Sequence, residues 1–468
     1  MNQQFVDREV ELNFLEERYA SDEAQFIVIY GKRRIGKTSL ILNFLKNKPY
    51  IYFLCEKTSI KLNLLKMAKK MAEYLERESF SRITFIDWED LFREFLEWKS
   101  SREKLVIVFD EFPYLIELDR GITSLFQKIW DEHLSKRSDI MLIICGSSIG
   151  MMETEILSHK SPLYGRRTGQ WKVTELDIRS IWKFIQSYSF EEVLHVYGSM
   201  GGTPAYLAKL DDKLSFYENI SNLFLSKGGV LYEEAENLLR QELREPRNYK
   251  LILNALADGY RRVVEISNIT GLDKAAVSRY LDTLQLLEIV DYETPILEKP
   301  KTKKRLYHIK DNYFNFWFKY IYPNKDLIEE EKPGIILTQI KEDLPTYMGP
   351  IFEKIAKKFL YKTNQTPFQI VKMGRQWWKT KKGEALEIDI LGYNQNKKKY
   401  IAIEVKWKNL TQNNVKRIIN QLKIKTEKLN IKGKIYHGII AKKIQNKQNL
   451  RSEGYLLFDL KDLKKAHI

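Results

Sequence analysis

The chain has 468 residues, of which 44% are hydrophobic and 30% charged. This composition is typical of a globular protein of about two to four domains and excludes a disordered chain. The two cysteines, Cys55 and Cys145, each end an apolar run and are expected to be free, buried thiols of a reducing compartment. The charged start of the chain lacks the apolar core of a signal peptide, and no apolar run reaches the about 20 residues of a membrane helix. We therefore expect a soluble, cytoplasmic protein without a membrane partner.

The net charge of +16 is concentrated near the carboxyl end. Residues 341–468 contain 29 lysines and arginines against 11 aspartates and glutamates, whereas residues 1–340 contain 49 against 51. A basic domain joined to a neutral one indicates a polyanionic partner. Nucleic acid is the first candidate and an anionic membrane the second. A lysine-rich genome or thermophily is the alternative explanation of the same composition.

Residues 26–39 contain the most informative motif, FIVIYGKRRIGKTS. It consists of an apolar strand, a loop that fits G-x-x-x-x-G-K-S/T, and the start of a helix. Such a loop turns backbone N–H groups toward phosphate oxygens, and the helix N-terminus adds its positive end. Lys37 is expected to reach the β- and γ-phosphates, and the Thr38 hydroxyl to bind Mg²⁺. The motif predicts a nucleoside triphosphate site formed by Gly31, Lys32, Arg33, Arg34, Ile35, Gly36, Lys37, Thr38 and Ser39.

Two further apolar runs end in polar residues that such a site needs. Residues 104–109 are followed by Asp110 and Glu111. Asp110 is expected to hold Mg²⁺ and contact the nucleotide, and Glu111 to polarise the attacking water as a general base. The run at 140–146 ends at Ser147 and Ser148, either of which is a candidate sensor of the γ-phosphate. An ordinary turn at the end of a strand is the alternative.

Arg166 and Arg167 are adjacent in the glycine-bounded loop SPLYGRRTG at 161–169. They are candidates for stabilising phosphoryl transfer, in cis or in trans, although an exposed arginine pair is often only solvated. The alternation of apolar strands with amphipathic stretches predicts a parallel α/β sheet covered by helices on both faces. After residue 175 the pattern becomes mainly helical, with a break at the Gly-Gly-Thr-Pro of residues 201–204.

Taken together, these motifs resemble the archaeal ATPase family, a branch of the P-loop ATPases near the AAA and STAND groups. The resemblance rests on FVDRE at 5–9, YGKRRIGKT at 30–38, FDEFPY at 109–114, CGSS at 145–148, LYGRRTG at 163–169 and GGTP at 201–204. It covers nearly the whole chain. It implies ATP and Mg²⁺ as cofactors, an AAA-like P-loop ATPase core over residues 1–170, and a helical lid over residues 171–240.

Residues 241–325 are predicted to form a winged helix-turn-helix. Gly271 marks the turn, Asp273 is a plausible N-cap, and the recognition helix begins at Lys274. The residues expected to contact DNA are Lys274, Ser278 and Arg279 in the major groove and Lys301, Lys303, Lys304 and Arg305 on phosphates. The alternative is that this module only packs on the ATPase or mediates protein contacts.

Residues 326–468 form the basic domain, in which two expected strands contain a possible metal site. One contains Asp389, and the returning strand contains Glu404 and Lys406 on one face. Two carboxylates can bind a divalent cation, and a lysine can orient or activate water for attack on phosphate. Glu353 is a candidate further acidic ligand, and Gln421 a weaker supporting residue.

This D…ExK pattern is similar to that of the PD-(D/E)xK nucleases. Archaeal ATPases commonly continue into a domain of unknown function that resembles restriction endonucleases, so the resemblance implies an α/β nuclease-like fold here. Two alternatives remain open: a nuclease-like fold that has lost cleavage, and a solvated Glu–Lys pair on a hairpin.

The sequence therefore predicts an ATPase coupled to a nucleic-acid-binding, nuclease-like domain. ATP would gate DNA processing, with DNA preferred over RNA and a metal-dependent deoxyribonuclease as the second activity. A homo-oligomer is compatible with this prediction. The alternative function is a STAND-like switch, in which nucleotide state controls assembly and nothing is cleaved. A plain winged-helix regulator would leave Asp389, Glu404 and Lys406 unexplained.

Overall fold

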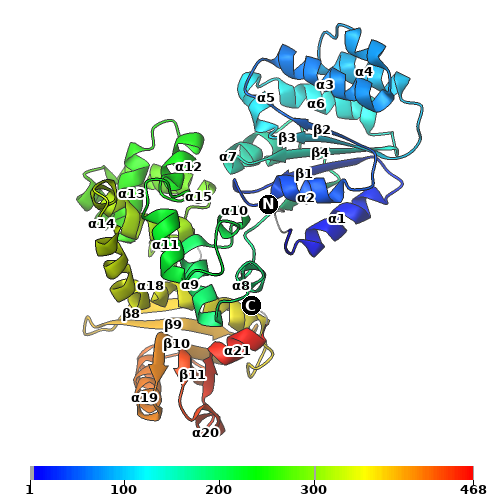
Figure 1. Ribbon diagram of the computed structural model, residues 1–468. Coiled ribbons are helices and arrows are strands. Elements are labelled where there is room, and N and C mark those ends of the chain that lie inside the picture. The colour runs from blue at the N-terminus through cyan, green and yellow to red at the C-terminus, as the bar shows by residue number, and fades with distance from the viewer. Residues whose placement is uncertain (1–4, 300–301, 467–468) are drawn as a thin grey trace. The chain divides into compact units, whose positions relative to one another are not determined.

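The computed structural model describes residues 5–299 and 302–466, so Lys301 lies outside the described residues. The chain folds into two compact units (Figure 1). Unit 1 consists of residues 1–176 together with 203–208, and unit 2 of residues 177–202 together with 209–468. The chain therefore passes between the units three times. The finer division into four domains stays a prediction.

A five-stranded parallel sheet in the order β2-β3-β4-β1-β5 forms the centre of unit 1. Its strands are β1 (Gln25–Tyr30), β2 (Tyr50–Leu54), β3 (Leu105–Asp110), β4 (Ile140–Gly146) and β5 (Gly169–Lys172). Every residue of β1, β3 and β4 is buried, as expected for parallel strands covered on both faces. This arrangement confirms the predicted parallel-sheet P-loop fold. The short β5, which pairs with β1, was not predicted.

Helices cover both faces of this sheet (Figure 1). The helices of unit 1 are α1 (Glu9–Tyr19), α2 (Lys37–Phe44), α3 (Ile60–Leu75), α4 (Trp88–Trp98), α5 (Pro113–Leu118), α6 (Ile122–Ile129), α7 (Ile149–Met151) and α10 (Pro204–Leu207). α1 and α2 pack on one face, and α3, α4 and α6 on the other. Cys55 and Cys145 are free, buried thiols, as predicted.

Unit 2 begins with helices and contains the predicted winged helix. The helices up to this module are α8 (Ile178–Trp182), α9 (Phe190–Met200), α11 (Phe216–Phe224) and α12 (Glu234–Glu242). The module consists of α13 (Arg247–Ala257), α14 (Val263–Thr270), α15 (Lys274–Leu286) and the antiparallel pair β6 (Val290–Glu293) and β7 (Leu306–Ile309). The Asp273 side chain accepts a hydrogen bond from the Ala276 N–H and so caps α15.

An aromatic segment connects the winged helix to the last part of the chain. It comprises α16 (Asn312–Phe316), a π-helical turn (Trp317–Ile321), α17 (Lys325–Glu329) and the long α18 (Pro333–Lys362). Phe316, Trp317 and Tyr320 are fully buried, so these aromatics form core rather than a base-stacking surface. Tyr347 of α18 donates a hydrogen bond to the Gly198 carbonyl of α9, which ties α18 to the first helices of the unit.

A five-stranded mixed sheet in the order β12-β11-β10-β9-β8 completes unit 2. Its elements are β8 (Lys372–Lys379), β9 (Ala385–Tyr393), β10 (Lys399–Leu410), α19 (Gln412–Lys428), β11 (Lys434–Ile444), α20 (Lys447–Ser452), β12 (Leu456–Asp459) and α21 (Leu460–Lys465). β8, β9 and β10 form an antiparallel meander, whereas β11 and β12 continue parallel to β10. α19 packs on the sheet core. α18 contacts the sheet through Phe352, whose ring packs against Trp407 of β10.

None of the helices in the described ranges is both long enough and apolar enough to cross a membrane.

Candidate nucleotide and nucleic-acid sites

The loop between β1 and α2 has the backbone that a phosphate-binding loop requires. Gly36, which precedes α2, has φ 91°, a left-handed conformation that glycine adopts without strain. A Cβ at Gly31 would lie 2.4 Å from the carbonyl oxygen of Val173, so no larger residue fits there. The N–H groups at the start of α2 are therefore presented from the carboxyl end of the sheet, where the helix dipole favours an anion.

Lys37 is buried beneath this loop, with 5% of its surface exposed. Its ammonium donates hydrogen bonds of 2.9 Å to the carbonyls of Gly31 and Lys32. Burial lowers the pKa of Lys37, while Cys145, Glu111 and Asp110 oppose that shift. Contact with a triphosphate requires Lys37 to exchange these carbonyl oxygens for phosphate oxygens.

Thr38 and Asp110, the two predicted Mg²⁺ residues, are in direct contact. The Thr38 hydroxyl donates a 2.7 Å hydrogen bond to Oδ2 of Asp110, and the Tyr52 hydroxyl donates another of 2.7 Å to the same oxygen. Burial raises the pKa of Tyr52, and the hydrogen bond to Asp110 raises it further, so Tyr52 remains a donor. Hydroxyl and carboxylate oxygens are the ligands that Mg²⁺ prefers. The donor set therefore fits the ion.

Tyr52 was missed in the sequence, where it belongs to an apolar run without a motif. Its role follows from its position in the sheet. β2 pairs in parallel with β3, and Tyr52 lies opposite Val108, two residues before Asp110.

Glu111 and Ser147 are bound to each other. The N–H and the hydroxyl of Ser147 each donate to the Glu111 carboxylate. Glu111 has φ 55°, a conformation uncommon for residues other than glycine. Ser147 thus contacts the expected general base, whereas the sequence suggested a contact with the γ-phosphate. Ser148 precedes the short α7.

Arg8 supports the P-loop and was given no role from the sequence. Its buried guanidinium donates to the carbonyls of Ile35 (3.1 Å) and Thr174 (2.8 Å) and pairs with Glu11 at 2.9 Å. The N–H of Ala205, the residue after the Gly-Gly-Thr-Pro segment, donates to the Arg34 carbonyl. Both contacts fix the loop from outside the G-x-x-x-x-G-K-S/T motif.

The remaining residues of the P-loop either contact neighbouring segments or are buried. The Lys32 ammonium pairs with Glu175 at 3.3 Å, and Arg33 donates to the Tyr114 hydroxyl at 3.5 Å. The Ile35 side chain is buried, and Ser39 lies in the first turn of α2.

The backbone of Arg166 and Arg167 lies at the opposite end of the strands from the P-loop. The N–H of Thr168, their neighbour, donates to the carbonyl of Phe26, near the start of β1. The P-loop begins at Gly31, after the end of that strand, about 16 Å farther along it. Arg166 pairs with Asp131 at 3.1 Å, and Arg167 donates to Gln170 at 2.7 Å. Burial lowers the pKa of Arg167, and Tyr30, the residue before Gly31, opposes that shift. The guanidinium therefore extends toward the P-loop end of β1, and the choice between action in cis and in trans stays open.

In unit 2, the mixed sheet brings Asp389, Glu404 and Lys406 together. The register of β9 and β10 places Ile390 opposite Ile403, so Asp389 and Glu404 directly follow the paired segment. Oδ2 of Asp389 accepts a 2.8 Å hydrogen bond from the Val405 N–H. The Lys406 ammonium lies 2.9 Å from Glu404 and 3.5 Å from Asp389. These neighbouring carboxylates raise the pKa of Lys406 against the opposing effect of burial. A charged Lys406 can orient water or phosphate but cannot accept a proton.

Glu353 contacts Arg375 and lies beside the group formed by Asp389, Glu404 and Lys406. The Arg375 guanidinium contacts the carboxylates of Glu353 and Glu387 and lies 3.3 Å from that of Glu293 in β6. Arg375 is placed by a bulge in β8, where the register with β9 shifts between Gly374 and Gln376. Burial raises the pKa of Glu353 to about 7, Arg375 opposes the shift, and Asp389 adds to it.

The predicted support from Gln421 is wrong. Gln421 is exposed on α19, whereas Lys425, one helical turn later, lies 3.3 Å from Glu404. The lysine compensates the buried carboxylate that Gln421 was expected to support.

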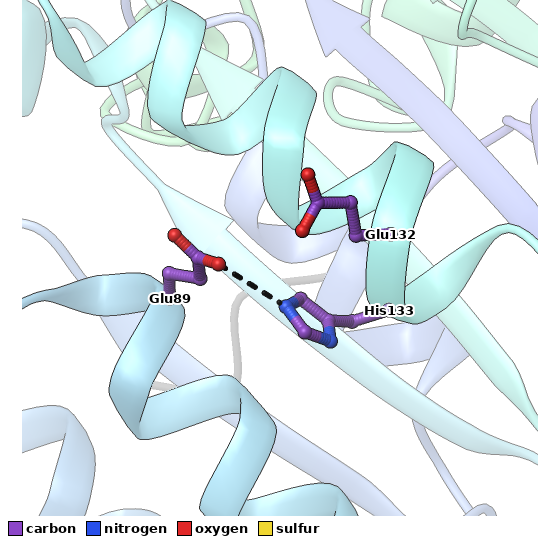
Figure 2. Close-up of side chains that lie close together, drawn as sticks. All are labelled: Glu89, Glu132 and His133. Atoms are coloured by element: carbon purple, nitrogen blue, oxygen red, sulfur yellow. Dashed lines mark ion pairs between the residues drawn. The ribbon is translucent and has the colours of Figure 1, made fainter.

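Glu353, Asp389 and Glu404 do not form a ready-made three-carboxylate cluster. Within the described residues, only Glu89, Glu132 and His133 of unit 1 bring one ligand atom each within 4.8 Å of one another (Figure 2). In that group the Lys128 ammonium lies 2.8 Å from Glu89 and lowers its pKa. Because a protein cation already neutralises Glu89, we assign no metal to this cluster.

The predicted DNA contacts of the winged helix are only partly on one face. Lys274 and Ser278 lie one turn apart on α15, whereas Arg279 is exposed on a different face. Lys303, Lys304 and Arg305 lie in the wing before β7, and Lys304 pairs with Glu298.

Comparison with known families gives three matches along the chain. A family described as an ATPase domain predominantly from Archaea matches residues 5–210. The arsR family of bacterial regulatory proteins matches residues 250–292, within the winged helix. A family of archaeal and bacterial proteins of unknown function matches residues 317–418.

Two relatives come from Methanocaldococcus jannaschii. An uncharacterized protein is 40% identical over 463 residues, which cover 98% of this chain and 99% of that protein. An uncharacterized ATP-binding protein is 52% identical over 44 residues, 9% of this chain and 75% of that protein.

Among solved structures, a Walker-type ATPase of Pyrococcus abyssi is 20% identical, with a TM-score of 0.49 over 68% of this chain and 97% of that one. The ORC2 protein of Aeropyrum pernix is 12% identical, with a TM-score of 0.41 over 71% and 97%. Likenesses of this strength do not by themselves define a fold.

Proposed function

The chain belongs to the archaeal ATPase family, and on this premise we propose that unit 1 binds ATP with Mg²⁺ and hydrolyses it. The observation that supports this most directly is the 2.7 Å hydrogen bond from Thr38 to Asp110 beside the buried Lys37. Bound Mg²⁺ would neutralise phosphate charge during the transfer. Lys37 would contact the phosphates, and Glu111, oriented by Ser147, would accept a proton from the attacking water.

Arg166 and Arg167 would act in trans in this mechanism. Their backbone lies near the amino end of β1, away from the P-loop of their own unit. A second copy of the chain could bring these arginines to the phosphates, where a guanidinium stabilises the charge of the transition state. The proposal therefore includes a homo-oligomer as the active form.

Unit 2 would bind nucleic acid, DNA before RNA, and cleave it with a divalent metal. The order of α18, the β8–β10 meander, α19 and the parallel β11 supports a PD-(D/E)xK nuclease-like fold. Asp389 and Glu404 are placed to hold the metal, and Lys406 to orient the attacking water. Glu353 could join as a further ligand only after it leaves Arg375. The free, buried thiols fit a cytoplasmic location.

The second candidate is a STAND-like switch that cleaves nothing. It is favoured by the ion pairs that the acidic residues already form. Arg375 neutralises the charge of Glu353. Lys406 and Lys425 neutralise that of Glu404. A site whose carboxylates are neutralised by protein cations can persist as inherited architecture. In this case ATP would control assembly alone.

ATP turnover measured with and without DNA separates the two candidates. Coupling of ATP to DNA processing predicts turnover that DNA stimulates and that is lost in Lys37→Ala. Slow turnover that DNA does not change, together with nucleotide-dependent oligomerisation, would favour the switch. No turnover in the wild-type chain under any of these conditions would contradict the assignment of an ATPase.

A further inference from the structure

A groove of about 1330 Å³ lies within unit 2, between the winged helix and the β8–β9 hairpin. One wall contains Lys274 and Ser278 of α15 and the wing residues 302–305. The other wall contains residues 377–379 and 385–387. The helix face expected to contact nucleic acid and the edge of the C-terminal sheet therefore border the same space.

The charged side chains that line this groove are almost all basic. The basic ones are Arg262, Lys274, Lys303, Lys304, Arg305 and Lys379. Among the lining residues that the structure describes, Glu387 is the only carboxylate, and Arg375 already pairs with it. Lys274, Lys303 and Lys379 form no ion pair with any described residue, so their charges are available to a ligand. A concave surface with this charge attracts a polyanion.

Two indole rings form part of the same lining. Trp377 and Trp378 are consecutive in β8, which is the edge strand of the sheet, and both are partly exposed. Trp378 packs in part against the core of the sheet. Trp377 points to the other side of the strand because side chains alternate. Aromatic faces beside a basic groove are what successive bases stack on when a single strand is bound.

We propose that this groove binds an unpaired stretch of a polynucleotide, with its phosphates toward the basic residues and a base stacked on Trp377. The base faces of a duplex are stacked on one another and hidden, whereas an unpaired strand offers phosphates and base faces together. This inference rests on the proposed nucleic-acid binding and adds that the bound strand is unpaired. It also gives the recognition helix a second wall, supplied by the C-terminal sheet.

Fluorescence anisotropy on the full-length chain tests the proposal, with labelled oligothymidylate, oligouridylate and a mixed-sequence duplex of the same length. We expect Trp377→Ala to weaken binding of the single strands roughly tenfold, as loss of one stacked base does, and to leave duplex affinity unchanged. Trp377→Phe, which keeps an aromatic face, should retain most of the affinity. Lys274→Ala and Lys379→Ala should each reduce the salt dependence of single-strand binding by about 0.7 in log–log slope.

Two control variants make the same changes outside the groove. Tyr50→Ala removes an aromatic that is 48% exposed on unit 1, and Lys69→Ala removes an exposed lysine of α3. Neither should change single-strand affinity, and melting curves should show that all variants are folded.

The outcomes separate this inference from the function on which it rests. If the wild type binds a single strand and Trp377→Ala leaves that affinity unchanged, the proposed binding in the groove is overturned, whereas the proposed nucleic-acid binding is retained. Binding of the duplex alone would also overturn it and would favour the usual docking of a winged helix. Binding of none of the three probes would contradict the proposed nucleic-acid function itself. A preference between oligothymidylate and oligouridylate reports the 2′-hydroxyl and the C5 methyl group together, and binding of either supports the groove.

Discussion

Arg375, at the bulge of β8, contacts the carboxylate of Glu353, the acidic residue that α18 presents beside Asp389. The same guanidinium reaches Glu293 in the winged helix and Glu387 in β9. One buried cation therefore joins the winged helix, α18 and the C-terminal sheet. Its position also decides whether Glu353 is available to a metal.

Arg375→Met should destabilise unit 2 by about 3–5 kcal/mol, because it leaves the largely buried carboxylate of Glu353 without its ion-pair partner. Chemical denaturation followed by tryptophan fluorescence measures the change. Arg82→Met is the matched control, since that arginine is 75% exposed and pairs with the exposed Glu78. We expect its loss to cost less than about 1 kcal/mol. Equal effects of the two substitutions would contradict a structural role for the Arg375 cluster.

Ser147→Ala should lower kcat for ATP about 10- to 100-fold with little change in KM, because Glu111 loses the hydroxyl that orients it. Ser147→Thr retains a hydroxyl and should restore part of the rate. Glu111→Gln should lower kcat by about 10²–10⁴ while ATP still binds. A Ser147→Ala variant that changes KM but not kcat would instead place the serine on the nucleotide.

Arg166→Ala and Arg167→Ala should reduce ATP turnover although the backbone of both residues lies away from the P-loop of its own chain. Mixing the arginine variant with Lys37→Ala tests the arrangement in trans. Each mixed pair would contain one site with an intact P-loop and an arginine from its partner, so activity should reappear in the mixture. A mixture whose ATP turnover never exceeds that of the two variants measured separately would contradict action between chains.

Unit 2 should lose stability in acid through His308. Burial lowers the pKa of His308 to about 3, with contributions from Lys354, Arg261 and Lys357, and Glu293 opposes the shift. The unfolded chain binds a proton near pH 6.5 and the folded one does not, so this contribution is complete above pH 6.5. It should fall by about 1.4 kcal/mol per pH unit between pH 6.5 and 3. His308→Gln should give a shallower dependence of the unfolding free energy, and parallel curves for the two proteins would contradict it.

Local motifs predicted the part of the protein that depends on short stretches of sequence. The P-loop, the carboxylates after β3 and the N-cap at Asp273 each involve neighbours along the chain, and each lies where the pattern indicated. The register of β9 and β10 likewise followed from an expected hairpin, so Asp389, Glu404 and Lys406 meet.

Contacts between distant segments could not be predicted in this way. Arg8 reaches Thr174 across 166 residues, and the place of Tyr52 beside Asp110 depends on the order of strands in the sheet. The bulge that turns Arg375 toward Glu353 has no sequence pattern of its own. Gln421 and Lys425 lie one turn apart on the same side of α19, so the position of the helix along β10, which tertiary packing sets, decides which of them reaches Glu404. The position of Arg166 and Arg167 depended on β5, which was too short and too polar to predict.

The most direct test of the central claim is cleavage of plasmid and branched DNA by the full-length chain, with Mg²⁺ or Mn²⁺ and with or without ATP. The proposed function predicts cleavage that requires the metal, changes with ATP and is lost in Asp389→Ala. Asp291→Ala, a substitution in the wing strand β6 away from the sheet site, serves as a control and should cleave normally. Absence of cleavage by both wild type and Asp389→Ala, from preparations that hydrolyse ATP, would contradict the nuclease assignment and leave the nucleotide-controlled switch.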